Sequence, residues 1–238
     1  MRVIDVPARV GFVWIKMAFG LFRAQPVGWI SLVAAWVMAS LGLSLVPFIG
    51  TAIAGILQPG FFGGFVIAAR DQEAGKPVGI HQLLAAFQVN GRALVTIGSI
   101  TLLANLLVVI SLGMLGLPLN IAPDAEGVPD MRAYARSLEG KEWILILGIT
   151  LTTMIKAALW FTAAILALNK MPATHAIRWS CYALIANFLP MLVFGTLMTV
   201  IFILALVPLM LGLLVAMPIF AIAHYVSYRD TFRPADES

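Results

Sequence analysis

Charged residues are scarce in this chain. Of its 238 residues, 11% are charged and 61% are hydrophobic, and the mean hydropathy is +0.99. A soluble domain carries about a quarter charged residues, which cover its surface in water. The composition therefore excludes a soluble globular domain and a disordered chain, and it predicts an integral membrane protein.

Cysteine pairs, clustered metal ligands and catalytic motifs are also missing. Cys181 is the only cysteine, so no intramolecular disulfide can form. His81, His175 and His224 are too scattered for a metal site of ordinary ligand spacing. No metalloprotease, nucleotide-binding or nucleophile-elbow pattern occurs. We therefore expect a protein that is not an enzyme and needs no cofactor or metal.

Long uncharged stretches are present instead, and they set the expected fold. A helix needs roughly 20 residues to cross the hydrocarbon of a bilayer. Membrane strands would alternate with a period of two residues, and these stretches do not. Turns at 47–50 and 206–208 divide the two longest stretches. We expect an all-α integral membrane fold of six transmembrane helices in three hairpins, at about 27–47, 50–69, 93–116, 143–168 and on either side of 206–208.

The basic residues predict the orientation, because cytoplasmic loops retain Lys and Arg. With the N-terminus inside, eleven basic residues lie in cytoplasmic segments, and Arg132, Arg136 and Lys141 lie outside. Both termini are then cytoplasmic, and residues 118–142 form an exterior loop with no rigid element. A basic inner rim binds anionic lipid headgroups, so it does not imply nucleic acid.

Each hairpin follows a segment that we expect to be an amphipathic helix at the cytoplasmic membrane surface. These segments are 8–22, 80–90 and 174–184, and apolar residues recur with helical spacing in the first two. Asp5, followed by Pro7, suits the start of the first helix. The basic residues expected at the membrane surface are seven apart, which places them in one stripe: Arg2, Arg9, Lys16 and Arg23.

This order of elements suggests an internal repeat within a single membrane domain, 1–238. The units would be 7–70, 77–170 and 172–229, and each would begin at a proline. Pro7 and Pro77 are 70 residues apart, whereas Pro77 and Pro172 are 95 apart. The difference equals the length of the exterior loop. The alternative is that the three hairpins have similar lengths without a common origin.

Several motifs carry a resemblance to a known family. They are Val6-Pro7-Ala8-Arg9 with Trp14, Phe22-Arg23 with Gln25-Pro26, Pro47-Phe48-Ile49-Gly50, Pro59 with Gly63-Gly64 and Ala68-Ala69-Arg70, and Phe161 to Leu168 with Pro172, Ser180 and Asn187. The chain resembles small uncharacterised inner-membrane proteins of proteobacteria, distantly like the YciC-type membrane proteins. The resemblance implies a bacterial inner-membrane location and six spans, and it supplies no activity. The family has a proline near Ala164, so its absence here implies a different kink in the fourth span.

One lysine lies within a predicted span. Lys156 is close to the middle of 143–168, where a lysine costs roughly 2.5–3.5 kcal/mol on insertion scales. No Asp or Glu lies within any predicted span to pair with it. It could be neutral, face an aqueous cavity, bind an anionic ligand or lipid, or meet a carboxylate of another subunit. The alternative is a lysine that reaches the surface along a tilted helix, with its amine bonded to carbonyls or to Thr152 and Thr153.

We expect Lys156 to point into the helix bundle or to a subunit contact, with Thr152, Thr153 and Asn105 beside it as a candidate ligand or partner site. Other polar residues at membrane depth are expected to form hydrogen bonds between helices, namely Gln58, Asn105, Asn187 and His224. A stripe of small residues on the second span allows close helix packing, within the chain or in a dimer: Gly60, Gly64 and Ala68.

The expected function is that of a non-catalytic inner-membrane protein. It would be a partner or accessory subunit of a membrane complex, or a protein that organises lipid. The alternative is a small-molecule or lipid binder or transporter with Lys156 in its site. The expected partners are the bilayer, its anionic headgroups, and either another membrane protein or further copies of the chain.

Overall fold

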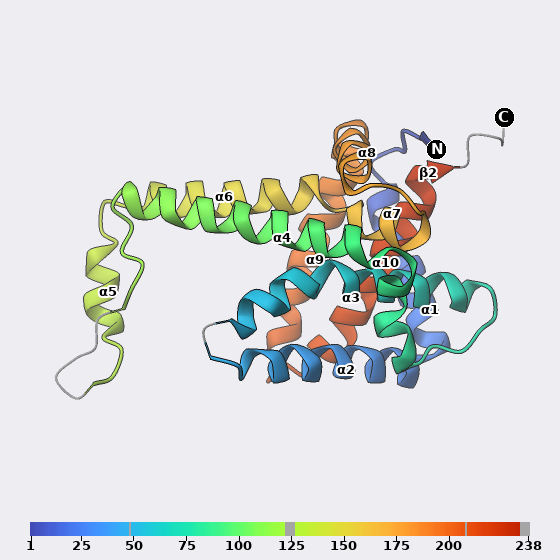
Figure 1. The fold of residues 1–238 in the computed structure, drawn as a ribbon, viewed down its shortest axis with the longest axis horizontal. Helices are drawn as coiled ribbons and strands as arrows, with labels where there is room; N and C mark the ends of the chain where they lie inside the picture. Colours follow the sequence, from blue (N-terminus) through green and yellow to red (C-terminus); the bar gives the residue numbers. More distant parts are fainter. Residues whose placement is uncertain (48, 122–126, 208, 234–238) are drawn as a thin grey trace. The chain divides into compact units, whose positions relative to one another are not determined.

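The computed structural model describes residues 1–47, 49–121, 127–207 and 209–233. These residues are mostly helical (Figure 1), so the predicted all-α fold is confirmed. The elements are β1 Arg2–Val3, α1 Val10–Ala24, α2 Pro26–Ser44, α3 Gly50–Glu73, the 3₁₀ helix η1 Ile80–Leu84, α4 Ala85–Met114, α5 Met131–Ser137, α6 Glu142–Ala158, α7 Thr162–Leu168, α8 Ala173–Ala186, α9 Phe188–Leu206, α10 Leu213–Thr231 and β2 Phe232–Arg233.

Five helical segments are long and apolar enough to cross a membrane. They are Pro26–Ser44, Gly50–Glu73, Ile80–Met114, Glu142–Leu168 and Phe188–Leu206. The sixth predicted span corresponds to α10, which is not among these five and whose second half holds polar residues such as His224 and Asp230. The turns predicted at 47–50 and 206–208 include Phe48 and Pro208, which lie outside the described residues.

The chain divides into two compact units, of which the smaller is Ile100–Ala157. In this unit α4 and α6 pack closely, because a Cβ atom on Gly148 would lie 2.5 Å from the side chain of Leu112. The exterior segment was expected to have no rigid element, and this expectation is wrong. It contains α5, whose N-terminus is capped because the Asp130 carboxylate accepts hydrogen bonds from the backbone N–H groups of Arg132 and Ala133.

The larger unit, Met1–Ser99 with Ala158–Ser238, is built around three helices. α3 packs against α7 and α10, and α10 also contacts α7. Each of the three helices contributes a run of seven buried residues, at 63–69, 161–167 and 221–227. Small residues allow this close packing, because a Cβ atom on Gly63 would lie 2.7 Å from that of Ala86 and 3.1 Å from that of Ala167.

The predicted span 143–168 is not one continuous helix. α6 ends at Ala158 and α7 begins at Thr162, although no proline stands between them. Side chains from two other helices bind the freed backbone groups. The Ser180 hydroxyl donates to the carbonyl of Ala158 (2.7 Å) and accepts from the N–H of Phe161 (3.1 Å), and His224 Nε2 lies 2.6 Å from the carbonyl oxygen of Trp160. These bonds satisfy backbone groups that the break leaves without a partner in their own helix.

Three shorter helices surround this core. α1 packs on α10 and α9, η1 packs on α3 and α2, and α8 packs on α7. The predicted segments 8–22, 80–90 and 174–184 are therefore helical, as expected. The predicted start of the first is wrong, because α1 begins at Val10 and its N-cap residue, Arg9, makes no side-chain capping bond.

Three amide residues mark the joints between these shorter helices and the apolar helices that follow. Gln25 separates α1 from α2 with φ −142° and ψ 59°, and Asn187 separates α8 from α9 with φ −115° and ψ 35°. Asn90 interrupts α4 with φ −153° and ψ 49°, so that the helical turns after η1 are set off from the apolar part of α4. The backbone therefore leaves the helical conformation in a similar way at all three joints.

The two ends of the described chain meet. β1 and β2 pair antiparallel, with Arg2 opposite Arg233 and Val3 opposite Phe232, and β2 lies beside the start of the chain in Figure 1. Strands of two residues leave no periodic pattern in a sequence, so they were not expected. The pairing fixes both ends at one side of the larger unit.

Replacing Gly64 with alanine is expected to destabilise the protein, because the added Cβ would lie 2.4 Å from the Leu83 carbonyl oxygen. Overpacking of this kind typically costs about 1–3 kcal/mol. Thermal unfolding in detergent measures the effect. Gly42→Ala is the matched control, because Gly42 is also in a helix and has no atom within 4 Å of the added Cβ. Equal unfolding temperatures for the two variants would contradict the close packing.

Candidate functional site

Lys156 is not in the middle of a continuous helix. It lies in the last turn of α6, and its side chain is exposed. Within the described residues its amine forms no ion pair. The break at Ala158 places it at a helix end, where a cation is stabilised by the helix dipole. The expectation that it points into the helix bundle stays a prediction. Contact with another subunit or with lipid stays a prediction.

In the described structure, the residues predicted to accompany Lys156 do not form a binding site around it. Thr153 is exposed and Thr152 is half-buried. The amide nitrogen of Asn105 donates to the carbonyl of Thr101, one turn earlier on its own helix, at 2.7 Å. This bond leaves Asn105 occupied within α4.

The small residues of α3 face a neighbouring segment of the same chain. A Cβ atom on Gly60 would lie 2.0 Å from the ring of Phe87, and one on Gly64 would meet the backbone of Leu83. Ala68 is fully buried. The stripe therefore accommodates the turns that run from η1 into α4.

Of the four polar residues expected to bond between helices, two bond to non-helical segments that are distant in the sequence. Asn187 accepts from the N–H of Val6 (2.9 Å) and donates to the carbonyl of Ile4 (3.0 Å), and His224 contacts Trp160 as described above. Gln58 is exposed, and Asn105 bonds within its own helix.

The outer face of α1 is both aromatic and basic. One side of the helix is buried against the core, at Gly11, Trp14, Ala18 and Phe22. The opposite side exposes Phe12 and Phe19 together with Lys16 and Arg23. The Arg23 guanidinium lies 5.8 Å from the centre of the Phe19 ring. Arg2 and Arg9 are exposed as well, so all four predicted membrane-surface basic residues are accessible.

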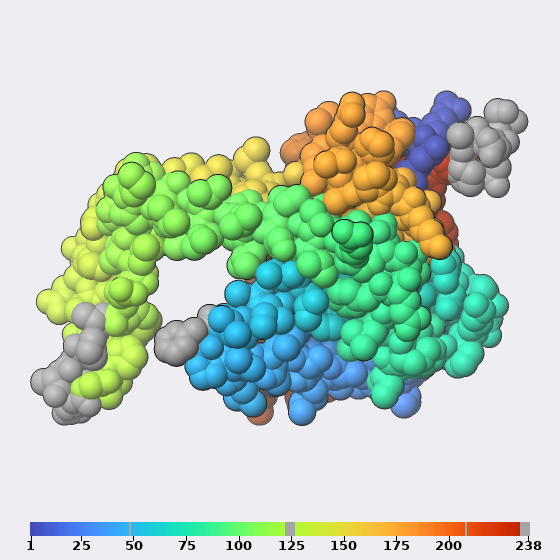
Figure 2. Space-filling view, viewed as in Figure 1, coloured from blue at the N-terminus to red at the C-terminus, as the bar shows by residue number. Residues whose placement is uncertain are grey.

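α8 and η1 share this division into a buried and an exposed side. The outer side of α8, orange in Figure 2, carries four residues around a surface hollow of about 580 Å³: His175, Arg178, Trp179 and Tyr182. Ile80 and Leu84 of η1 are exposed, whereas Gln82 and Leu83 are buried. Each short helix therefore presents large side chains outward.

An ion-paired cluster that the sequence analysis did not find joins α1, α3 and α10. Glu73, at the end of α3, accepts from the Tyr225 hydroxyl (2.8 Å) and is ion-paired with Arg229. Asp230 accepts from Arg229 (2.9 Å) and from the indole N–H of Trp14 (3.1 Å). The adjacent Arg and Asp of α10 are visible in the sequence, but nothing there indicates the long-range partners Glu73 and Trp14.

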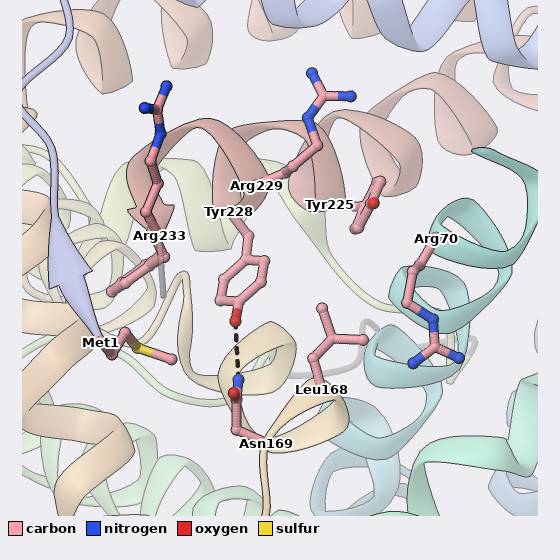
Figure 3. Close-up of a pocket in the computed structure, with 9 residues that line it drawn as sticks. Met1, Arg70, Leu168, Asn169, Tyr225, Tyr228, Arg229 and Arg233 are labelled. Carbon is pink, nitrogen blue, oxygen red and sulfur yellow. Dashed lines mark hydrogen bonds between the residues drawn. The ribbon is translucent and has the colours of Figure 1, made fainter. Parts of the chain in front are cut away.

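A pocket lies beside this cluster, where α3, α7 and α10 end (Figure 3). Its volume is about 350 Å³, and its lining residues are Met1, Arg70, Leu168, Asn169, Tyr225, Tyr228, Arg229, Phe232 and Arg233. None of them is acidic. The Tyr228 hydroxyl accepts from the Asn169 amide at 2.8 Å, so its own proton is available to another acceptor.

This arrangement provides binding groups. Within the described ranges, no three His, Cys, Asp or Glu side chains are grouped so that they could hold a metal ion. The accessible groups are guanidinium, hydroxyl and aromatic side chains, which suit anions and membrane headgroups.

Comparison with known proteins gives one informative match. No family model matches the chain, and no solved structure matches it. Over 195 residues it is 29% identical to a probable inner membrane protein of Burkholderia thailandensis, which covers 76% of this chain and 68% of that protein. The finer resemblance to YciC-type proteins stays a prediction. Five helices among the described residues are long and apolar enough to cross a membrane, and the chain is similar to that inner-membrane protein over most of its length.

Proposed function

We propose that this protein is a non-catalytic inner-membrane protein that organises anionic lipid at its cytoplasmic face. The observation that carries the proposal is the outer face of α1. Phe12 and Phe19 can enter the headgroup layer while Lys16 and Arg23 bind lipid phosphates, and the opposite side of the helix is anchored on the core. α8 and η1 support it, because they also expose large side chains.

The proposal also includes six membrane crossings. β1 and β2 are paired, which supports placing both ends of the chain on one side of the membrane. A chain with both ends on one side crosses an even number of times, and the five apolar helices alone would give an odd number. α10 supplies the sixth crossing. Its 19 residues extend about 28 Å, close to the thickness of the hydrocarbon.

The same topology gives three hairpins, α2 with α3, α4 with α6 and α7, and α9 with α10. The short helices α1, η1 and α8 precede them at the cytoplasmic surface. The excess of Lys and Arg in the segments beside the termini supports this orientation. A protein partner, assembly into homo-oligomers and a role for Lys156 stay predictions, because no described contact favours them.

Cysteine labelling in intact cells tests the topology. In a Cys181→Ser background, we expect a membrane-impermeant maleimide added outside to label Glu139→Cys and not Lys76→Cys or Arg233→Cys. All three positions are exposed, so all three should react once the membrane is permeabilised. External labelling at Lys76→Cys or Arg233→Cys would contradict the six-crossing topology.

Removal of two charges tests lipid organisation. The double variant Lys16→Gln with Arg23→Gln should retain less phosphatidylglycerol than the wild type when purified from nanodiscs of mixed composition. We expect a decrease of about fivefold per residue, because each basic residue near an anionic surface contributes about 1 kcal/mol. Lipid mass spectrometry measures the retained ratio of phosphatidylglycerol to phosphatidylethanolamine.

Arg132→Gln with Arg136→Gln is the matched control for that experiment. It also removes two exposed basic residues, but from α5 in the proposed exterior segment. An equal decrease in both double variants would show a general effect of net charge and would count against a role for α1.

A further inference from the structure

Among the described ion-paired and neighbouring side chains, cations outnumber anions around the pocket at the ends of α3, α7 and α10. Three carboxylates are present, and each is already ion-paired: Asp71 with Arg70 and Lys76, and Glu73 and Asp230 with Arg229. Arg2 and Arg233 stand beside them with no ion pair among the described residues. The region therefore holds five cationic side chains and three anionic ones.

The two unpaired arginines are held directly opposite each other. Arg2 and Arg233 are partners in the register of β1 and β2, so their side chains leave the ribbon on the same face. The other face carries Phe232, which is buried. Like charges directly opposite in a ribbon are destabilising. A bound anion between or beside them would remove this repulsion.

Hydrogen-bond donors remain free around the pocket. Arg70 uses its Nε and one Nη group for Asp71, which leaves other N–H groups of its guanidinium unused. Arg233 uses none within the described residues, and Tyr228 has its hydroxyl proton available. In Figure 3 Tyr228 lies between Arg233 and Arg70; its hydroxyl points toward Asn169, whereas the guanidinium of Arg233 points the other way. The volume of about 350 Å³ falls within the range of small-ligand sites.

We propose that this pocket binds a phosphate-bearing anion, with Arg70 and Tyr228 as donors and with the positive charges of Arg233 and its strand partner Arg2 nearby. At a membrane surface the anion is the headgroup of an acidic phospholipid, and a soluble phosphate ester offers the same chemistry. This inference deepens the proposed function, because it assigns one defined binding site to the lipid that the surface helices attract. Arg229 is a positioning residue, since its carboxylate partners occupy it.

The test compares wild type, Arg233→Gln and Tyr228→Phe by mass spectrometry of the intact protein in micelles with equimolar phosphatidylglycerol and phosphatidylethanolamine. We expect one phosphatidylglycerol to be retained by wild type. Retention should be roughly tenfold weaker in Tyr228→Phe, which loses one charge-assisted hydrogen bond, and about fivefold weaker in Arg233→Gln, which loses one nearby positive charge. Arg233→Gln should leave the unfolding temperature in neutral detergent unchanged or raised, because it removes a like-charge contact. Arg132→Gln is the control and should retain the lipid as wild type does.

Competition identifies the source of the phosphate. Displacement of the retained lipid by millimolar glycerol phosphate or inorganic phosphate would support a site for soluble phosphates, and resistance would support a lipid site. Undiminished retention in both Arg233→Gln and Tyr228→Phe would overturn the pocket assignment. If only the α1 variant then lost lipid, the proposed function would stand without this site. If only the pocket variants lost lipid, the site would stand and the role of α1 would fail.

The three joint amides carry a second inference, independent of the first. Gln25 donates to the carbonyl of Lys76 (3.2 Å) and accepts from the N–H of Val78 (2.8 Å). These two residues flank Pro77, which stands before η1. Gln25, between α1 and α2, therefore binds by hydrogen bonds the segment that leads into the second hairpin.

The other two joints repeat this arrangement. Asn90 donates to the carbonyl of Met171 (2.9 Å), which precedes Pro172 at the start of α8. Asn187 accepts from the N–H of Val6, which precedes Pro7 and α1. Each amide thus binds the segment around the proline that begins the next unit. The third amide, Asn187, binds the segment that begins the first unit.

Helix packing follows the same cycle. η1 packs on α3, α8 on α7, and α1 on α10, so each short helix lies on the last helix of the preceding unit. We infer that 7–70, 77–170 and 172–229 are three copies of one unit, arranged as a ring that closes non-covalently between Asn187 and the N-terminal segment. The seven-residue buried runs of α3, α7 and α10 then occupy equivalent positions in the three units.

Thermal unfolding of Gln25→Leu, Asn90→Leu and Asn187→Leu tests the ring. Each variant should unfold roughly 2–4 °C or more below wild type, whereas Asn105→Leu should not, because Asn105 bonds only within its own helix. Deletion of residues 2–5 should be non-additive with Asn187→Leu and additive with Gln25→Leu. Additivity in both pairs, or a wild-type unfolding temperature for Asn187→Leu, would overturn the closed ring.

Discussion

Close packing of the buried runs in α3, α7 and α10 is the constraint on which the rest of the larger unit depends. Within a bilayer, apolar side chains gain little by leaving lipid for protein, so helices associate through tight van der Waals contact and polar bonds. Gly63 meets Ala86 and Ala167 at distances that exclude a larger side chain. The shorter helices α1, η1 and α8 then pack on the outside of this core, and one side of each stays exposed.

The polar groups of the larger unit follow from the same packing. A helix that breaks in an apolar setting must satisfy the backbone groups it frees. Ser180 and His224 do this at the break between α6 and α7, and both reach it because α8 and α10 pack against α7. The amides of Gln25 and Asn187 likewise bond segments distant in the sequence but adjacent in the fold. These side chains are structural in the sense that each one binds backbone.

The helical fold was accessible from the sequence because a membrane imposes long gaps between charges. Five apolar segments are at the expected positions. Of the polar residues predicted to bond between helices, only Gln58 is exposed. The break after Ala158 was not accessible, because no proline marks it and its stabilising groups come from remote helices. Lys156 was misplaced for that reason, since a continuous span would have put it near mid-membrane. The Glu73 and Arg229 pair was missed because its partners are far apart in the sequence.

The core also explains why the basic side chains gather beside the pocket. The buried runs of α3 and α7 are followed directly or closely by Arg70 and Lys170, and that of α10 by Arg229. A cation in the last turn of a helix is stabilised by the carbonyl dipoles there, so Arg70 and Arg229 are held at helix ends that favour them. Pairing of β1 with β2 brings Arg2 and Arg233 to the same end. The nearby carboxylates among the described residues already bind Arg70, Lys76 and Arg229, so the proposed anion would meet the positive charge of Arg2 and Arg233.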